Sequence, residues 1–342
     1  MPAQTLREIS GDEYRRWFES DGPALDHRSP FHHPAWLEAA SGGIDFQLRF
    51  IGIVHGGELV AAVPGFLARR GPFRLFGSPL RGTMTSYLGP VGALGDVDRT
   101  ELALQCSRFA RARWRVAYTR FSFRDAPAEG RVSLGAGWRQ STPRSYRLDL
   151  TKGSDALWAR LESDCRRNIR KAGRLGITTV NMNDARLFYG MLEETLQRHG
   201  STSWQPEAFF RLIMEGLLPR DLLWSWGAHY DGKIIAAGLF LHDENEVHYL
   251  SGASRPEYGS LPTSYLLHWQ AIETGANAGL NTFHSEASQV RSIDQFKESF
   301  RPMAERRHTL IWTPRIVRRA EKAYMDASQR MRRWKSTRRR RA

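Results

Sequence analysis

The pattern of apolar residues along the chain predicts one β-hairpin that occurs twice. The runs 46–54 and 58–67 are apolar and rich in β-forming residues, and the intervening His-Gly-Gly supplies a turn. The same arrangement returns at 222–230 and 234–241, around an intervening Asp-Gly-Lys. The segments HGGELVAA and YDGKIIAA correspond at an offset of 175 residues. An ancient duplication is the simplest explanation.

Each hairpin is embedded in the same order of predicted elements. A strand ending in a Tyr-Leu motif follows it, at Tyr87-Leu88-Gly89-Pro90 and at Tyr249-Leu250-Ser251-Gly252, an offset of 162. A helix and a further strand come next, and two helices precede each hairpin. The predicted helices span about 11–20, 34–40, 99–113, 184–199, 205–217 and 262–278, and the further strands span 115–123 and 280–286. This order predicts an α/β fold of two tandem domains, each a mixed sheet flanked by helices.

The chain length supports two domains, because 342 residues exceed what a single core usually organises. The join is expected between Gly130 and Ser154, where glycines and prolines surround SYRLDL, a strand that would open the second domain. We therefore predict domains at 1–143 and 144–313 and a separate tail at 314–342. Since no long flexible linker is evident, we expect the halves to pack closely, with a ligand cleft between them.

Composition is that of an ordinary folded protein, with 41% hydrophobic, 25% charged and 11% aromatic residues. The sequence shows neither a signal-peptide pattern nor a run of 18 apolar residues, so we expect a cytoplasmic protein. Cys106 and Cys165 lie far apart and without metal-ligand spacing. His32 and His33 precede Pro34 without an acidic or cysteine partner nearby, so we expect them to cap and pack rather than to bind metal.

The net charge of +14 is concentrated at the end of the chain. Residues 301–342 contain 15 Lys and Arg against 3 Asp and Glu, so this segment carries +12 of the total. From Pro314 onward the pattern predicts a basic helix that ends in RRRR. Such a helix can bind RNA, acidic lipid headgroups at a membrane surface or an acidic partner, or can simply keep the protein in solution.

Five segments carry a resemblance to a known family. They are FHHPAW (31–36), SDCRRNIRKAGRLGITTV (163–180), AAGLFLHDENEVHYLSGAS, LPTSYLLHWQAIETGANAGLNTF and QFKESFRP (295–302). In this order they resemble the Fem-type aminoacyltransferases and the cellulose-biosynthesis-type acetyltransferases of the GNAT superfamily, over most of the chain. The resemblance implies two tandem GNAT-like domains and transfer of an acyl or aminoacyl group to an amine. The donor would be acyl-CoA or aminoacyl-tRNA, used as a co-substrate rather than held as a tightly bound cofactor.

The resemblance places the donor where two parallel strands separate, at 247–253 and 281–286. The helix that begins near Pro262 would offer N–H groups and hydroxyls to a phosphate, and Arg255 would add a charged contact. The candidate donor-binding residues are Ser251, Arg255, Gly259, Ser260, Thr263 and Ser264. The segment RPEYGS departs from the Arg-x-x-Gly-x-Gly/Ala loop of acyl-CoA-dependent relatives, which leaves a capped helix after an ordinary turn as the other interpretation.

Removal of a proton from an attacking amine requires a base, and histidine and carboxylate side chains near this point are the candidates. His284 and Glu286 alternate along one strand and should share a face, and His248 lies on the predicted neighbouring strand. We predict these three as catalytic residues, with hydrogen-bonded structural roles as the alternative.

Cations elsewhere are candidates for binding the acceptor or a phosphate. The helix around 166–174 places Arg166, Arg167, Arg170 and Lys171 close together, either as a phosphate-binding surface or as a solvated basic face. Lys297 could pair with a phosphate or carboxylate, or lie solvated on a helix.

Two functions remain open on the sequence. The first is an N-acyltransferase acting on an amine-bearing acceptor, either a small molecule or a cell-envelope precursor. The second is a non-catalytic GNAT-like binding module in envelope or exopolysaccharide assembly.

Overall fold

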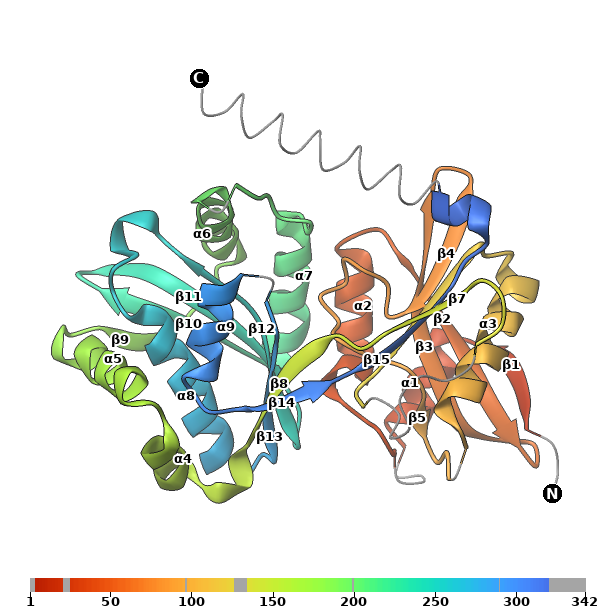
Figure 1. Ribbon diagram of the computed structural model, residues 1–342, viewed down its shortest axis with the longest axis horizontal. Helices are drawn as coiled ribbons and strands as arrows, with labels where there is room; N and C mark the ends of the chain where they lie inside the picture. The colour runs from red at the N-terminus through yellow and green to blue at the C-terminus, as the bar shows by residue number, and fades with distance from the viewer. Residues whose placement is uncertain are drawn as a thin grey trace. The chain divides into compact units, whose positions relative to one another are not determined.

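The computed structural model describes residues 4–20, 25–95, 97–125, 134–198, 200–288 and 290–319. Its contacts divide the described chain into two compact units. The first comprises residues up to Pro143 together with a segment that begins at Arg306, and the second spans Arg144–Glu305. Each unit is built on one mixed sheet (Figure 1).

The first unit has a sheet in the order β1-β2-β3-β4-β6-β15-β7, with the short β5 paired to β3. Helix α1 begins with a capping box, in which the Ser10 side chain accepts from the Glu13 amide. The strands are β1 (Thr5–Ile9), β2 (Gln47–His55), β3 (Glu58–Arg70), β4 (Phe73–Ser78), β5 (Val91–Gly92), β6 (Tyr118–Phe123), β7 (Trp138–Ser141) and β15 (His308–Trp312). The helices are α1 (Gly11–Phe18), α2 (Pro34–Gly42) and α3 (Arg99–Trp114).

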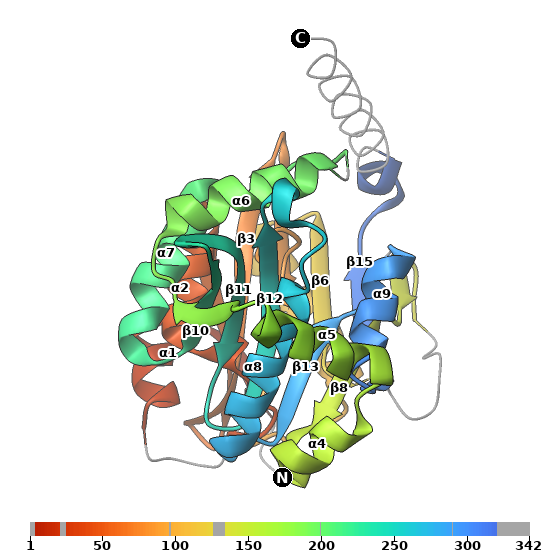
Figure 2. The same cartoon turned by 90° about the vertical axis from the view of Figure 1, so that its left-hand side faces the viewer.

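The second unit has a sheet in the order β14-β8-β13-β12-β11-β10-β9. The strands are β8 (Arg144–Asp149), β9 (Thr178–Asn181), β10 (Leu223–Tyr230), β11 (Lys233–His242), β12 (Glu246–Ser254), β13 (Thr282–Glu286) and β14 (Met303–Arg306). The helices are α4 (Ser154–Arg160), α5 (Ser163–Arg174), α6 (Ala185–Arg198), α7 (Glu207–Leu217), α8 (Thr263–Asn277) and α9 (Arg291–Glu298). Helix α8 packs on one face of the sheet with α5 and α4 outside it, and α6 and α7 lie on the opposite face (Figures 1 and 2).

The two sheets share one topology, as the repeated pattern predicts. In each, antiparallel strands lead to one parallel pair, β4 with β6 and β12 with β13, which a single helix connects. Both hairpins turn through two residues with positive φ, Gly56 and Gly57 in one and Asp231 and Gly232 in the other. Their bulges also correspond, since Ile53 and Ala228 are 175 residues apart. The prediction of two tandem mixed-sheet domains is confirmed.

The duplication is combined with an exchange of strands between the two sheets. The sixth place of the first sheet is filled by β15, which pairs antiparallel with β6 and β7. Counted from β9, the sixth place of the second sheet is filled by β8, which pairs antiparallel with β13. The chain therefore leaves the first sheet after β7 and returns to it at β15. The predicted second domain ended at residue 313, whereas the strand His308–Trp312 lies in the first sheet.

The predicted strand at Tyr87-Leu88-Gly89-Pro90 is wrong. These residues lie in the connection between β4 and α3, and β4, at Phe73–Ser78, is the topological counterpart of β12. Tyr87 and Leu88 are buried, so their apolar character reflects packing of a loop rather than a strand. In the predicted basic tail, residues 315–319 are helical, and Ala320 and the residues after it lie outside the described part of the chain.

A separate apolar core lies beside each crossover helix. Cys106, Ala110 and Trp114 of α3 pack with Phe76 and Phe121 of the first sheet, and Leu310 of β15 belongs to this core. Leu267 and Ile272 of α8 pack with Phe240, Val247 and Phe283 of the second sheet. Among the described residues, none of the helices combines the length and apolar character needed to cross a membrane.

Candidate active site

The parallel strands β12 and β13 separate partway along their length. They pair at Glu246 with Thr282, at Val247 with Phe283 and at His248 with His284, which is the last pair. Beyond it, β12 continues to Ser254 and β13 to Glu286. Strands that separate in this way leave backbone N–H and C=O groups without their ladder partners, so this point can receive an extended ligand.

A bulge in β12 lies immediately after the last pair. Tyr249 pairs with Phe240 and Ser251 pairs with Leu239, so Leu250 is the extra residue. A bulge interrupts the hydrogen-bond ladder and turns the local backbone. Ser251, predicted to bind the donor, therefore follows the bulge in the separated part of β12.

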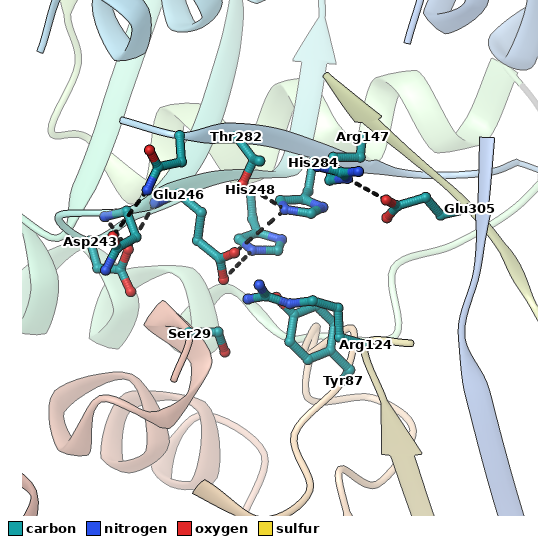
Figure 3. A network of polar contacts seen from close by, with 12 residues as sticks. Ser29, Tyr87, Arg124, Arg147, Asp243, Glu246, His248, Thr282, His284 and Glu305 are labelled. Carbon is teal, nitrogen blue, oxygen red and sulfur yellow. Dashed lines mark hydrogen bonds and ion pairs between the residues drawn. The ribbon is translucent and has the colours of Figure 1, made fainter. Parts of the chain in front are cut away.

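A buried network of one carboxylate and two imidazoles lies at the last pair (Figure 3). Nε2 of His248 is 3.1 Å from Oε1 of Glu246, and Nε2 of His284 is 3.4 Å from Oε2. The two imidazole rings stack with centroids 4.6 Å apart and planes 7° from parallel. The printed hydrogen bond to the carboxylate comes from His248, whereas the hydrogen bond of His284 Nε2 is made with Oγ1 of Thr282, and the carboxylate lies close enough to stabilise a positive charge on either ring.

The three side chains also offer ligand atoms that lie within 4.8 Å of one another, and two histidines with a glutamate are a zinc-binding set. The lone pairs of nearly parallel rings, however, run side by side rather than converging on one ion. The hydrogen bonds of His248 to Glu246 and of His284 to Thr282 hold the two rings instead.

Polar contacts on both sides fix this network in place. Oδ1 of Asp243 accepts from the amides of Asn245 and Glu246, each at 2.9 Å, which holds the turn before β12. Burial raises the pKa of Asp243 to about 6, with the charge of Glu246 as the next cause. Thr282 Oγ1 lies 3.0 Å from Nε2 of His284. Across the sheet His284 pairs with Arg147, whose guanidinium bonds to Glu305 (Figure 3).

The other face of the separated strands carries a second polar group. Lys297 of α9 is buried, donates to the backbone carbonyl of Glu286 and lies 5.7 Å from the ring centroid of Tyr249. Burial lowers the pKa of Lys297. The ring of His268 on α8 lies 4.3 Å from that of Tyr249, centroid to centroid, with the two planes tilted by 48°. Lys297 is therefore buried, and the alternative that it lies solvated on the surface of a helix is wrong.

The loop from β12 into α8 differs from the expected phosphate-binding loop. The Gly259 amide donates to the carbonyl of Pro256, so the expected phosphate contact from this amide is already taken within the loop. Nε of Arg255 lies 3.3 Å from the carbonyl of Ile234. Thr263 and Ser264 stand in the first turn of α8, where helix amides lack intrahelical partners, and Ser260 is exposed just before it. Arg198 of α6 also reaches this loop and donates to Oγ of Ser254 at 3.1 Å.

The predicted basic helix is α5, and its cations have different environments. Arg166 is turned towards the end of α4, where its guanidinium donates to the carbonyls of Trp158, Ala159 and Leu161. Arg167 pairs with Asp164 at 3.1 Å on the surface. The guanidinium of Arg170 lies over Trp158 at 5.4 Å, and Lys171 is exposed. Arg166 therefore caps a helix, but it also lines a hollow on α5 together with Arg167, Arg170 and Arg174, and its predicted phosphate-binding role stays a prediction.

Replacing Arg166 by Ala tests whether its contacts with the end of α4 stabilise the fold. We expect the free energy of unfolding to fall by about 2 kcal/mol, because the last carbonyls of α4 lose a charged donor. The matched Arg174→Ala variant removes an exposed cation of the same helix and should change stability by less than about 0.5 kcal/mol. Urea unfolding measures both variants. An unchanged midpoint in Arg166→Ala would show that the contacts to α4 do not stabilise the fold, and weaker tRNA binding by this variant would support its predicted phosphate-binding role.

The adjacent histidines of the first unit have structural contacts, as predicted. Nδ1 of His33 accepts from the Ala35 amide at 3.1 Å and caps α2. His32 is buried, and its Nδ1 lies 2.9 Å from Oγ of Ser29.

Sequence reasoning missed three members of the site. Glu246 and His248 alternate in EVH, a spacing that places both side chains on one face of a strand, so Glu246 could have been found by this rule. His268 lies within a helix of mostly apolar residues, and Arg147 lies on a strand more than 100 residues away in sequence. No local signal links either of them to the site.

Comparison with known proteins agrees with this geometry. A family model described as an acetyltransferase (GNAT) domain matches residues 159–298, which contain β12, α8, β13 and α9. No curated protein sequence matches the chain.

Solved structures share the fold of the whole chain. The crystal structure of FemX has a TM-score of 0.68 at 12% identity, covering 89% of this chain and 96% of FemX. A tandem GNAT protein from the clavulanic acid biosynthesis pathway has a TM-score of 0.55 at 11% identity, covering 90% and 98%. The C-terminal domain of a putative lysylphosphatidylglycerol synthetase from Agrobacterium fabrum has 0.52 at 16%, covering 86% and 91%. Residues 159–298 thus match the model of a GNAT acetyltransferase domain, and the chain as a whole shares its fold with FemX and with a tandem GNAT protein.

Proposed function

We propose that this protein is an N-acyltransferase that moves an acyl or aminoacyl group from an activated donor to an amine-bearing acceptor. One observation carries the proposal. The parallel strands β12 and β13 separate directly beyond a buried network of Glu246, His248 and His284. Backbone donors for an oxyanion and a base for the amine therefore lie at the same place on the sheet.

The reaction needs two proton movements and one exchange of bonds. The amine nitrogen, once deprotonated, attacks the carbonyl carbon of the thioester or ester, and a tetrahedral oxyanion forms. The new C–N bond remains and the C–S or C–O bond breaks, with the leaving group taking up a proton. In this scheme the His284 ring receives the proton of the attacking amine, and the Glu246 carboxylate stabilises the resulting imidazolium.

Charge that develops on the oxyanion requires donors that are already in position. The amides of the separated part of β12 supply such donors, because beyond His248 they have no parallel partner on β13. The buried ammonium of Lys297, close to Tyr249 and to the end of β13, adds further N–H groups. In this role Lys297 acts as an electrostatic group of the site rather than as a phosphate ligand.

The donor would enter at the first turn of α8, beside Arg255 and Arg198. Acyl-CoA and aminoacyl-tRNA both carry phosphates that such a helix start attracts. Because the Gly259 amide is already bonded within its own loop, a donor that needs this amide for a pyrophosphate is disfavoured. Aminoacyl-tRNA is for this reason the donor we favour, with an amine-bearing small molecule or cell-envelope precursor as the acceptor.

A direct transfer assay tests the proposal. Radiolabelled acetyl-CoA and a mixture of aminoacyl-tRNAs are supplied in parallel with a panel of polyamines, amino sugars and envelope precursor peptides. Transfer from either donor that His284→Ala reduces by at least about 100-fold, in a variant with unchanged circular dichroism, supports the enzyme.

Binding of donors without transfer would support the second candidate function. If donors bind and stabilise the protein but no transfer occurs at any acceptor, the chain is a binding module, as the occupied Gly259 amide would also allow.

A further inference from the structure

A small cavity lies inside the second unit and is lined by residues of β8, β13, α8 and α9. Its volume is about 10 Å³, which holds one water molecule and no larger ligand. Among its lining residues, His268, Ser285 and Lys297 are polar, and Tyr146 donates its hydroxyl to Glu298 at 2.8 Å. A buried water needs about two to four polar partners, so this cavity has both the size and the polar groups for one.

His268 lines this cavity with an acceptor that lacks a donor. The residue is only 4% exposed, and its Nδ1 lies 3.0 Å from the carbonyl oxygen of Ser264, which can only accept, so Nδ1 carries a hydrogen. Burial lowers the pKa of His268 to about 3, with the charge of Lys297 as the second cause, so the ring is neutral near pH 7 and Nε2 is an acceptor. This Nε2 is buried and has no hydrogen-bond partner among the described residues. Because buried polar atoms are normally satisfied by protein or by ordered water, Nε2 points to a donor inside the cavity.

Lys297 brings donors to the same cavity. Its ammonium has three N–H groups, and one of them donates to the backbone carbonyl of Glu286. The other two can donate in other directions, and the positive charge lies close enough to His268 to lower the pKa of that ring. The ammonium makes no direct hydrogen bond to Nε2 of His268. A single water between the two side chains can donate to Nε2 and accept from Lys297 at the same time.

We propose that one water molecule occupies this cavity and joins His268 to Lys297, which makes His268 a positioning residue of the acyl-transfer site. One hydrogen of the water donates to Nε2 of His268, the water oxygen accepts from Lys297, and the second hydrogen is directed at the hydroxyl oxygen of Ser285. With one N–H held by the Glu286 carbonyl and a second by the water, the third N–H of Lys297 has a fixed direction. The water site stands on the cavity alone, whereas the benefit to transfer rests on the proposed function, in which Lys297 stabilises the oxyanion.

The bridging water also favours the charged form of Lys297. Burial lowers the pKa of Lys297, and the negative charge of Asp294 opposes this effect. A water whose hydrogen is held by His268 turns its oxygen to the ammonium and stabilises the positive charge in the same sense. Burial raises the pKa of Tyr249 and of Tyr146 to about 12, so these phenols stay neutral while Lys297 titrates. The titratable residues around Lys297 are His268 on α8, Tyr249 on β12, Glu286 on β13, Tyr146 on β8, and Asp294 and Glu298 on α9.

Replacing His268 by Leu tests the bridge through the pKa of Lys297. The variant removes the acceptor at similar volume, so the water loses a partner and we expect the pKa of Lys297 to fall by about 1 or more. ¹³C NMR of the lysine side chains measures this pKa without any substrate, and the signal that is missing in Lys297→Met assigns it. His268→Gln keeps a carbonyl acceptor and should retain most of the wild-type value. His242→Leu, at another buried histidine on β11, is the control and should leave the pKa unchanged.

The pH dependence of transfer gives a second readout. Because Lys297 has to be charged to stabilise an oxyanion, kcat/KM should decrease as the pH rises through the pKa of Lys297. In His268→Leu this decrease should begin at a pH that is lower by the same amount, whereas in His268→Gln it should stay near the wild-type position. A purely structural role of His268 would lower the rate or the stability without moving this limb of the profile.

A high-resolution crystal structure of the wild type gives a test that needs no variant to fold. We expect density for one water within hydrogen-bond distance of Nε2 of His268 and of Nζ of Lys297. A cavity without water, or an unchanged pKa of Lys297 in His268→Leu, would overturn the inference. A lowered pKa in that variant, in a protein that transfers no acyl group from any donor, would keep the bridge and overturn the proposed function instead.

Discussion

Replacement of Glu246 by Gln is expected to lower the rate of acyl transfer by about 10²–10⁴-fold while the chain stays folded. Oε1 of the carboxylate lies 3.1 Å from Nε2 of His248, and Oε2 lies 3.4 Å from Nε2 of His284. The amide of glutamine offers one oxygen acceptor and one NH2 donor in the same volume. The neutral amide can no longer stabilise an imidazolium on His284, so this ring takes the amine proton less readily.

Steady-state transfer rates of the wild type and of Glu246→Gln measure this effect. Glu246→Ala also removes the volume of the side chain, so it should cost about 3–5 kcal/mol of stability in addition to activity. Glu215→Gln, an exposed position on α7, is the matched control and should behave like the wild type. A Glu246→Gln protein with more than half of the wild-type rate would show that the base lies elsewhere.

The repeated hairpin was predictable because its determinants are local. Residues 55–57 and 231–233 have the small or turn-forming side chains that a two-residue turn requires, and the flanking runs have strand composition. The crossover helices α3 and α8 were found for the same reason, with ends within one residue of those predicted. The placement of His248 on the strand next to His284 was also predicted, and the structure pairs the two residues across β12 and β13.

The strand exchange could not be predicted, because no local property of His308–Trp312 says which sheet receives it. Its short run of mostly apolar and β-forming residues fits a strand in either sheet, and proximity in sequence favoured the second. The segment at Tyr87 and Leu88 was predicted as a strand because a buried loop has the same apolar composition as a strand. His268 gave no signal because an aromatic side chain on a helix face usually belongs to the core, and only the three-dimensional surroundings reveal its unpaired nitrogen.

Ending the chain after Arg306 is expected to abolish folding of the first unit, although every residue up to Pro143 remains. The truncation removes β15 from the interior of the first sheet, where it forms five residue pairs with β6 and four with β7. It also removes Leu310, which is fully buried in the core beside α3. Each lost hydrogen bond contributes about 1 kcal/mol net and the leucine about 2 kcal/mol, against a total stability of about 5–15 kcal/mol for a domain.

Limited proteolysis followed by mass spectrometry measures the outcome for each unit separately. In the chain that ends at Arg306, cleavage should spread through β2, β3 and α3, whereas sites within β10–β13 should remain protected, since the second sheet keeps all of its strands. A chain that ends at Arg319 keeps every described residue and is the control, with the cleavage pattern of the full protein. Addition of a synthetic 306–319 peptide should restore protection of the first unit, because the strand fits between two existing edges. A truncated protein with an intact first unit would show that β15 is dispensable and that the exchange of strands does not join the two units energetically.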